Sequence, residues 1–385
     1  MTTAPPVAPT QEQISRWAST KFGLLAHGAV LTTTADAAMH DVKKPIRTRS
    51  GVSGGLDITI DDCIHVNVPI VESFVRESPY KLDFSDGNFI IQEGTETLTS
   101  FQPLPTPEYY HKQTLGDRES MRRIGQMCSA DRFCYGMTGP TCYFWRRDRR
   151  CRYCSIGKNY SADAARKQEH HLMEVLGEAL TDRNLPARHV LLGGGTPTGD
   201  DMGATLAAEL TVKIKEKYDI PIYVMIAAPL DNRYIDELKA AGVDELGMNL
   251  EFWSEQAWKR YIPGKDSVIG RNRYLEALEY AVNLFGPINT RSILIAGLEP
   301  PEETEAAAIH LAQMGVMPII SPFRPLEDTM LAQARGFTGP QYVKLWYDLT
   351  RAIDGLGIPL GPACIACQNN TLALPVGNYY RSNAE

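Results

Sequence analysis

Six short apolar runs alternate with helical patterns over the second two-thirds of the chain. The runs lie at residues 132–138, 187–195, 220–228, 243–252, 289–298 and 316–323. Between them, segments such as 231–242 and 302–315 carry apolar residues at helical spacing and end on glycine, a common residue just after a helix. Alternation of strands and helices at this length predicts parallel β-α-β units, which form either a barrel or a doubly wound sheet.

The first third of the chain has a different pattern. Residues 56–62 and 64–71 alternate apolar and polar positions, which predicts strands, and 80–94 predicts a hairpin that turns at Asp86 and Gly87. We therefore expect the chain to have three parts. They are a disordered tail at 1–12, an accessory α+β region at 13–118, and an α/β barrel domain at 119–385 that ends in a Cys-x-x-Cys segment.

Net charge, hydrophobic content and the number of cysteines exclude some classes of function. A net charge of −7 argues against a general binder of nucleic acid or of a membrane surface, and a hydrophobic content of 43% is ordinary for a globular protein. We expect no membrane span, because no run of about 18 apolar residues occurs. The first residues lack the pattern of a secretory signal, so a cytoplasmic location is the expectation. In a reducing compartment, eight cysteines favour metal binding over disulfides.

Polar residues and glycines lie directly after the ends of most of the predicted strands. In barrels and doubly wound sheets, ligands bind at the carboxyl ends of the strands, so these positions share one rim. The rim positions are Cys142, Gly193, Gly194, Gly195, Thr196, Glu251, Gly297, Glu299 and Arg324. Their number on one rim predicts a binding site there.

Three cysteines, Cys142, Cys151 and Cys154, lie within one arginine-rich loop on that rim. Three thiolates are able to hold a zinc ion with an open position, or three irons of a [4Fe–4S] cluster whose fourth iron is left to bind a small molecule. Packing as small apolar side chains does not suit so charged a loop. A zinc-binding α/β barrel protein with a structural or hydrolytic metal is therefore the alternative to a cluster protein.

The end of this loop, Cys-Arg-Tyr-Cys, resembles the end of the motif of the radical S-adenosylmethionine (SAM) superfamily. That motif is usually Cys-x3-Cys-x-aromatic-Cys, whereas eight residues separate Cys142 from Cys151 here. Cys134 lies within the first predicted strand, which makes Cys142 the better first ligand. The resemblance implies a partial (β/α)6 TIM-like barrel, SAM as a cofactor beside Tyr153, and a [4Fe–4S] cluster held by Cys142, Cys151 and Cys154.

Two further segments are similar to SAM-binding segments of that superfamily. The glycines Gly193, Gly194 and Gly195 with Thr196 resemble a Gly-Gly-Glu segment that hydrogen-bonds the SAM amino group, although threonine replaces the acidic residue. Residues 249–251 resemble the Asn-Leu-Asp/Glu segment of the biotin synthase-like branch. This implies that Asn249 and Glu251 lie near the ribose or methionine end of SAM.

Weaker likenesses concern the remaining parts of SAM. The segment that begins near Gly297 resembles one that packs beside adenine. Arg273, with Arg271 as an alternative, stands where related enzymes place a basic partner for the SAM carboxylate. The resemblance thus implies an enzyme that reductively cleaves SAM to a 5′-deoxyadenosyl radical, which abstracts hydrogen from a small-molecule substrate.

The arginines of the cysteine loop suggest how electrons arrive. Arg146, Arg147, Arg149 and Arg150 lie between the proposed ligands. Flavodoxin or ferredoxin is the expected donor, because such acidic proteins are drawn to a basic patch. A solvated loop, or contact with an anionic substrate group, is the alternative.

The last cysteine pair, Cys364 and Cys367, is a candidate for a second metal site. Cys128 and Cys134 form another pair, and together the four thiols would suffice for a cluster or a zinc site. We expect Cys128 near the amino end of the first strand and residues 364–367 near the opposite rim. On that expectation the two pairs would not meet.

Overall fold

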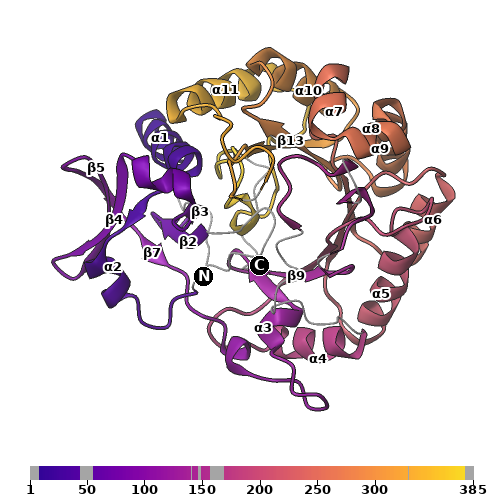
Figure 1. Cartoon of the computed structure of the whole chain (residues 1–385), viewed down its shortest axis with the longest axis horizontal. Coiled ribbons are helices and arrows are strands. Elements are labelled where there is room, and N and C mark those ends of the chain that lie inside the picture. Colours follow the sequence, from indigo (N-terminus) through magenta and orange to yellow (C-terminus); the bar gives the residue numbers. More distant parts are fainter. Residues whose placement is uncertain are drawn as a thin grey trace.

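The computed structural model describes residues 8–43, 55–139, 141–145, 149–156, 169–327 and 329–377. Within these ranges a seven-stranded sheet has the order β14-β13-β12-β11-β10-β9-β8, and neighbouring strands from β9 to β14 are parallel. Figure 1 shows the sheet curled into an incomplete ring with helices around its outside. The fold is a partial TIM-like barrel, as the strand–helix alternation predicts.

The six parallel strands fall inside the six predicted apolar runs. They are β9 Arg132–Gly136, β10 His189–Gly193, β11 Ile222–Ile226, β12 Glu245–Met248, β13 Thr290–Ala296 and β14 Met317–Pro322. The sequence analysis missed β8 Gln126–Cys128, which pairs antiparallel with β9 at the edge of the sheet. A strand of three residues is too short to show an alternating pattern.

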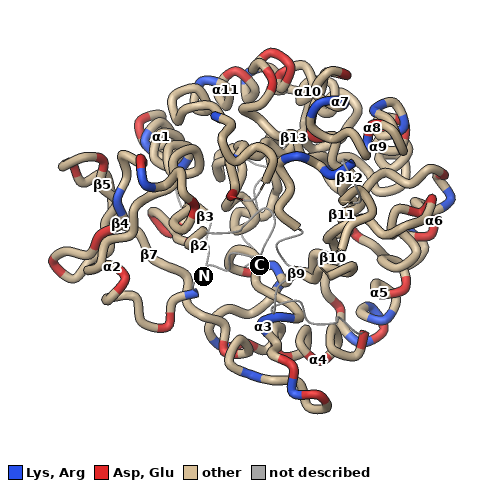
Figure 2. Tube along the Cα trace, in the orientation of Figure 1, with Lys and Arg blue, Asp and Glu red and all other residues tan. Residues whose placement is uncertain are grey.

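Helices cover the outer face of the sheet. They are α4 Glu169–Leu180, α5 Ala204–Lys217, α6 Arg233–Ala240, α7 Glu255–Tyr261, α8 Pro263–Val268, α9 Arg271–Phe285, α10 Pro301–Gln313 and α11 Gly339–Ala352. Many charged positions lie on these outer helices (Figure 2). No described helix is both long enough and apolar enough to cross a membrane.

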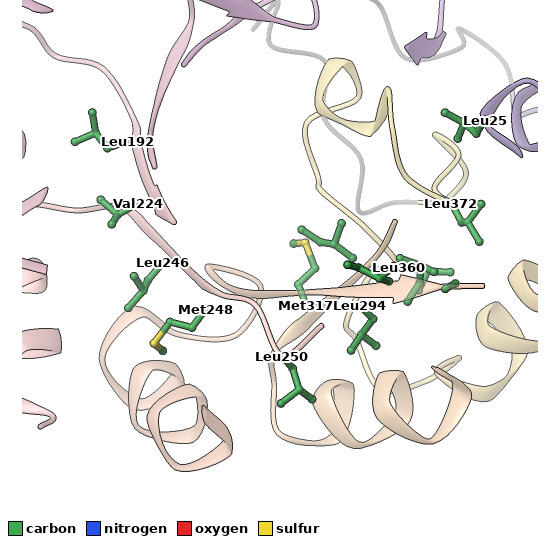
Figure 3. Close-up of a cluster of buried hydrophobic side chains, with 14 of the residues drawn as sticks. Leu25, Leu192, Val224, Leu246, Met248, Leu250, Leu294, Met317, Leu360 and Leu372 are labelled. Atoms are coloured by element: carbon green, nitrogen blue, oxygen red, sulfur yellow. The ribbon is translucent and has the colours of Figure 1, made fainter. Parts of the chain in front are cut away.

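Alternate residues along each strand face the helices and the interior of the barrel. Leu192, Val224 and Leu246 are fully buried on the helix side and belong to the cluster in Figure 3. Their neighbours Leu191 and Tyr223 line the interior cavity instead. This alternation follows from the two-residue period of a strand. It gives the barrel one apolar layer under the helices and a separate inner surface for a ligand.

Two small sheets and three helices lie in the described part of the chain before β8. The elements are α1 Gln11–His27, β1 Val30–Leu31, α2 Thr33–Ala38, β2 Gly55–Ile60, β3 Ile64–Pro69, β4 Tyr80–Ser85, β5 Asn88–Glu93, β6 Glu96–Ser100, β7 Gln102–Pro103 and α3 Met121–Ile124. Short 3-10 turns lie at Ser73–Glu77, Glu108–His111 and Tyr143–Trp145. The predicted hairpin is confirmed, and Asp86 and Gly87 at its turn have φ of 52° and 78°.

The boundaries of the N-terminal region differ in part from the expectation. Helix α1 begins at Gln11, and the side chain of Thr10 accepts a hydrogen bond from the amide of Gln13. Residues 11 and 12 therefore belong to a capped helix and not to a disordered tail. The division between accessory region and barrel near residue 118 stays a prediction.

The N-terminal region packs against the open side of the barrel, between β14 and β8 (Figure 1). The buried ammonium of Lys21 donates to the carbonyls of Gln368 and Ala373, and Lys43 donates to the carbonyl of Ser129 just after β8. The C-terminal segment also reaches β14, because the amide of Leu372 donates to the carbonyl of Ile320. Both ends of the described chain thus close the barrel.

Candidate active site

A cavity of about 830 Å³ occupies the interior of the barrel. Inner side chains of β9, β10, β11, β13 and β14 form its wall, and loops after the strands form its rim. Its volume lies in the usual range for ligand sites, about 300–1,000 Å³. The rim that the strand pattern predicts is therefore the mouth of a cavity large enough for a small-molecule ligand.

The cysteine loop lies at this rim. Cys142, Cys151 and Cys154 all line the cavity, and all three are half-buried. The amide of Thr196 donates to Sγ of Cys142 over 3.4 Å, and the amide of Arg152 donates to the carbonyl of Tyr261 over 2.8 Å. These bonds join the loop to the segment after β10 and to the end of α7, and the three thiols face one cavity.

Burial and mutual repulsion both act on these thiols. Burial raises the pKa of the Cys151 thiol, and the neighbouring sulfurs of Cys154 and Cys142 raise it further. A bound cation removes both penalties, because it compensates several thiolates at once. Cys151 is therefore expected to ionise when a bound metal or iron–sulfur cluster compensates its charge.

The glycines after β10 allow the cysteine loop to pack closely against the backbone. A Cβ at Gly195 would lie 1.9 Å from the carbonyl oxygen of Thr141 and 2.8 Å from Cβ of Cys142. Gly194 has a φ of 129°, which side chains rarely allow. Gly193 and Thr196 line the cavity with them. The close approach of two backbones thus requires glycine at 195.

We expect Gly195→Ala to displace the cysteine loop, because the added Cβ overlaps backbone atoms that have no room to move. Iron bound after anaerobic reconstitution should fall several-fold, as measured by iron and sulfide assay. Gly116→Ala is the matched control, since a Cβ at Gly116 meets nothing within 4 Å. Equal iron content in both variants would contradict this role for Gly195.

A buried ion pair lies below the cysteine loop. Nζ of Lys265 is 2.9 Å from Oε1 of Glu251, and the two side chains are only 11% and 9% exposed. Burial disfavours the charged lysine, but Glu251, Tyr274 and Cys151 together outweigh the effect of burial and raise the pKa of Lys265. The pair lines the cavity together with Asn249, whose carbonyl also accepts from Lys265.

The backbone holds Glu251 in an unusual conformation. Its φ is 68°, its amide donates to the carbonyl of Ile293, and its carbonyl accepts from the amide of Ile295. A non-glycine residue in this region costs free energy and persists only where its surroundings determine it. Two hydrogen bonds to β13 supply that constraint and direct the carboxylate into the cavity.

Tyr153 adds a buried hydroxyl beside the same pair. Burial raises the pKa of its phenol well above the usual value, and the charge of Glu251 raises it further. Tyr153 therefore stays protonated and lines the cavity as a hydrogen-bond donor. Sequence reasoning selected Tyr153 and Glu251 but missed Lys265, because a single lysine between two strands gives no pattern.

Arg273 and Gly297 lie outside the cavity lining. Nε of Arg273 donates to the carbonyl of Pro229, and Nη2 donates to Oδ1 of Asn232, so the side chain ties α9 to the loop after β11. A Cβ at Gly297 would lie 2.7 Å from the hydroxyl of Tyr342, which explains that glycine by packing. Their assignment to SAM stays a prediction.

Three other predicted positions have structural partners. Arg271 stacks over the ring of Trp253 at 4.0 Å from its centroid. Glu299 accepts from the amides of Trp253 and Ser254 at the start of α7. Arg324 lines the cavity and donates to the side chain and carbonyl of Asn67. Of these two rim positions, Glu299 thus accepts hydrogen bonds from amides at the start of α7, whereas Arg324 lines the cavity.

The remaining cysteines differ from the expectation. Residues 364–367 lie at the amino ends of β9 and β10, not at the opposite rim. Sγ of Cys364 is 3.8 Å from Oδ1 of Asp131, just before β9, and Sγ of Cys367 is 3.1 Å from Nε2 of His189, the first residue of β10. A disulfide joins Cys128 and Cys134 across β8 and β9, in contrast to the expectation of cysteines without disulfides.

A family comparison decides between the classes that this site allows. Residues 148–311 match the family model of the radical SAM superfamily. The matched part of the chain is a radical SAM domain. The family implies a [4Fe–4S] cluster and SAM as cofactors, a reductant, and a small-molecule substrate. The matched range includes Cys151 and Cys154 but begins after Cys142. The first ligand therefore rests on the geometry alone, and the biotin synthase-like branch stays a prediction.

Several proteins resemble parts of this chain. Bacteriochlorophyllide c C-7(1)-hydroxylase of Chlorobaculum limnaeum is 25% identical over 197 residues, which cover 46% of this chain and 49% of that protein. The chain thus spans about half the length of this curated relative. The structure of methylornithine synthase (PylB) has a TM-score of 0.48 and 14% identity, over 62% of this chain and 66% of that chain. HydG, a maturase of the [FeFe]-hydrogenase, has a TM-score of 0.43 and 18% identity, over 58% and 49%.

Proposed function

We propose that this radical SAM enzyme binds a [4Fe–4S] cluster through Cys142, Cys151 and Cys154 and cleaves SAM to act on a small molecule within the barrel. The observation that carries the proposal is the meeting of these three thiols at the mouth of the cavity. When bound, the cluster would supply the electron that splits SAM into methionine and a 5′-deoxyadenosyl radical.

The residues of the chain would hold SAM in place. Asn249 and the Glu251–Lys265 pair offer a carbonyl, a carboxylate and an ammonium at the cavity wall, which suit the polar methionine and ribose groups. Gly194 and Thr196 would bring backbone groups close to the ligand, because no side chain stands at Gly194. These contacts position the reacting carbon, which lowers the entropic part of the barrier.

The inner wall would protect the reaction from water. Leu191, Met225, Ile293, Ile295 and Ile319 line the cavity from β10, β11, β13 and β14. Apolar walls exclude water from the reacting centre. The substrate would therefore lie between these strands, below SAM and above the closed end of the barrel.

Anaerobic purification tests the proposal. We expect a brown protein with about four irons and four sulfides per chain, consistent with one [4Fe–4S] cluster. Any other bound metal is counted separately. Reduced protein with SAM should release 5′-deoxyadenosine and methionine, measured by liquid chromatography and mass spectrometry. Zinc without iron, and no 5′-deoxyadenosine, would favour the zinc-binding alternative instead.

The electron donor is a further part of the proposal. Arg146 and Arg147 lie outside the described residues. Arg149 is exposed, and the Arg150 guanidinium lies 5.3 Å from the ring centroid of Trp145. Both flank the cluster loop, so flavodoxin or ferredoxin would dock close to the metal. Attraction between a basic patch and an acidic partner raises encounter rates and weakens with salt.

We expect changing Arg146, Arg147, Arg149 and Arg150 to Gln to slow turnover with flavodoxin about tenfold or more at low salt, because steering contributes that much or more. Salt dependence should flatten at the same time. Turnover with dithionite, which needs no docking, should change little, and Arg183→Gln is a control at a highly exposed site. Equal losses with both reductants would contradict docking at this loop.

A further inference from the structure

We propose that Asp131, His189, Cys364 and Cys367 form a tetrahedral zinc site at the amino end of the barrel, separate from the cluster loop. One ligand atom from each residue lies within 4.8 Å of all the others. The four residues come from three places in the chain: the residue before β9, the first residue of β10, and the C-terminal segment. The site would join that segment to the barrel.

The distances suit a single ion. Sγ of Cys364 lies 3.8 Å and 3.9 Å from the two carboxylate oxygens of Asp131, and Nε2 of His189 lies 3.1 Å from Sγ of Cys367. Bonds of about 2.3 Å to sulfur and about 2.0–2.2 Å to nitrogen and oxygen place tetrahedral ligand atoms about 3.3–3.8 Å apart. The cluster of side chains therefore has the size of one zinc coordination sphere.

The donor types select the metal. Two thiolates, an imidazole and a carboxylate form a mixed set that suits zinc, whereas iron–sulfur clusters take mainly cysteine sulfur. The Cys-x-x-Cys spacing is also usual for zinc, and the amide of Cys367 lies 3.3 Å from Sγ of Cys364, where it donates to that sulfur. Four protein ligands leave no open position, so the site is structural.

The surroundings balance the charge. Two thiolates and one carboxylate carry one negative charge more than Zn²⁺ neutralises. The Arg132 guanidinium interacts electrostatically with Cys367, and Arg291 interacts with both Cys364 and Cys367. Arg132 also stands directly opposite His189 in the pairing of β9 with β10. Arg132 begins β9 and Arg291 lies in β13, and both would stabilise an anionic metal site from outside its ligands.

The zinc site would close the floor of the cavity. Cys367 lines the cavity from below, while Cys142, Cys151 and Cys154 line it at the rim after the strands. The two metal centres would thus lie at opposite ends of one space. Their independence allows the zinc site to be tested in protein that has no SAM cluster.

The test uses the 385-residue chain carrying Cys142→Ala, Cys151→Ala and Cys154→Ala together, supplied anaerobically with zinc, iron and sulfide. We expect about one zinc per chain and little iron, measured by mass spectrometry of metals. X-ray absorption at the zinc edge should show two sulfur and two nitrogen or oxygen neighbours. Because this measurement needs no change at the site, misfolding of a site variant does not confuse it.

Site variants complete the test. Adding Cys364→Ala or His189→Ala to this chain should lower zinc content at least several-fold, whereas Cys63→Ala, at a buried cysteine in the turn between β2 and β3, should leave it unchanged. Three results would overturn the proposal: no zinc in the parent chain, zinc undiminished by Cys364→Ala, or about four irons with sulfide retained. The last result would mean a second cluster. None of them bears on SAM cleavage by the unaltered protein.

Discussion

Replacing Cys142, Cys151 or Cys154 singly with alanine should lower 5′-deoxyadenosine formation by more than about a hundredfold, because even partners outside the ligand set commonly cost about 10–100-fold. Each thiol would supply one of three iron ligands, and the loop that carries them is fixed by bonds from Thr196 and Arg152. Liquid chromatography and mass spectrometry measure the product after reduction with dithionite. Iron content, measured in parallel, should fall with it.

Cys63→Ala is the control for these variants. Cys63 is a free, buried cysteine outside the cavity lining, so its replacement should leave cluster and activity intact. Cys134→Ala tests whether Cys142 is the first ligand. Cys134 is joined to Cys128 by a disulfide, so its replacement should leave the cluster in place. Full activity in Cys142→Ala with complete loss in Cys134→Ala would show that the first ligand is Cys134.

Lys265→Met should destabilise the protein by about 3–5 kcal/mol, the usual cost of leaving one partner of a buried ion pair uncompensated. Glu251 has little exposure to water and a constrained backbone, so its carboxylate is unable to move to solvent. Urea unfolding of the protein without cofactors measures the loss. Lys259→Met is the matched control, because Lys259 pairs with Glu255 across an exposed helix face.

The double variant Glu251→Gln with Lys265→Met separates stability from binding. It removes both charges, so most of the lost stability should return. SAM affinity should nevertheless stay weaker by about ten- to a hundredfold, since a hydrogen bond to a charged ligand contributes about 1.5–3 kcal/mol. Anaerobic calorimetry measures it. Wild-type affinity in the double variant would mean that the pair supports the fold alone.

The barrel could be predicted from the sequence because its signals are local. Each parallel strand lies within one apolar run. Glycines after the helices indicate where each helix ends and the next strand is close. The rim followed from these assignments, since the carboxyl ends of parallel strands share one edge. Thus Cys142, Thr196 and Glu251 were predicted to meet, and all three line the cavity.

Other parts of the site depend on contacts between distant residues, which no local pattern reports. Lys265 pairs with Glu251 only because α8 folds back under the rim. Cys364 and Cys367 were expected near the wrong end of the barrel, because the segment after α11 has no periodic pattern that gives its direction. Asp131 and His189 were not selected at all. A single aspartate and a single histidine become candidates only when the fold places two cysteines beside them.

The closure of the barrel by both ends of the described chain has a consequence for synthesis. Lys21 lies in the first helix, yet its buried ammonium is satisfied by carbonyls of Gln368 and Ala373. Synthesis must therefore have passed Ala373 before both contacts form, and contacts between such distant residues form slowly. Until then the side of the barrel between β14 and β8 lacks the N-terminal region that packs there in the folded protein. Delivery of the cluster and protection of the nascent chain would accordingly fall within the same interval, before the N-terminal helix meets the C-terminal segment.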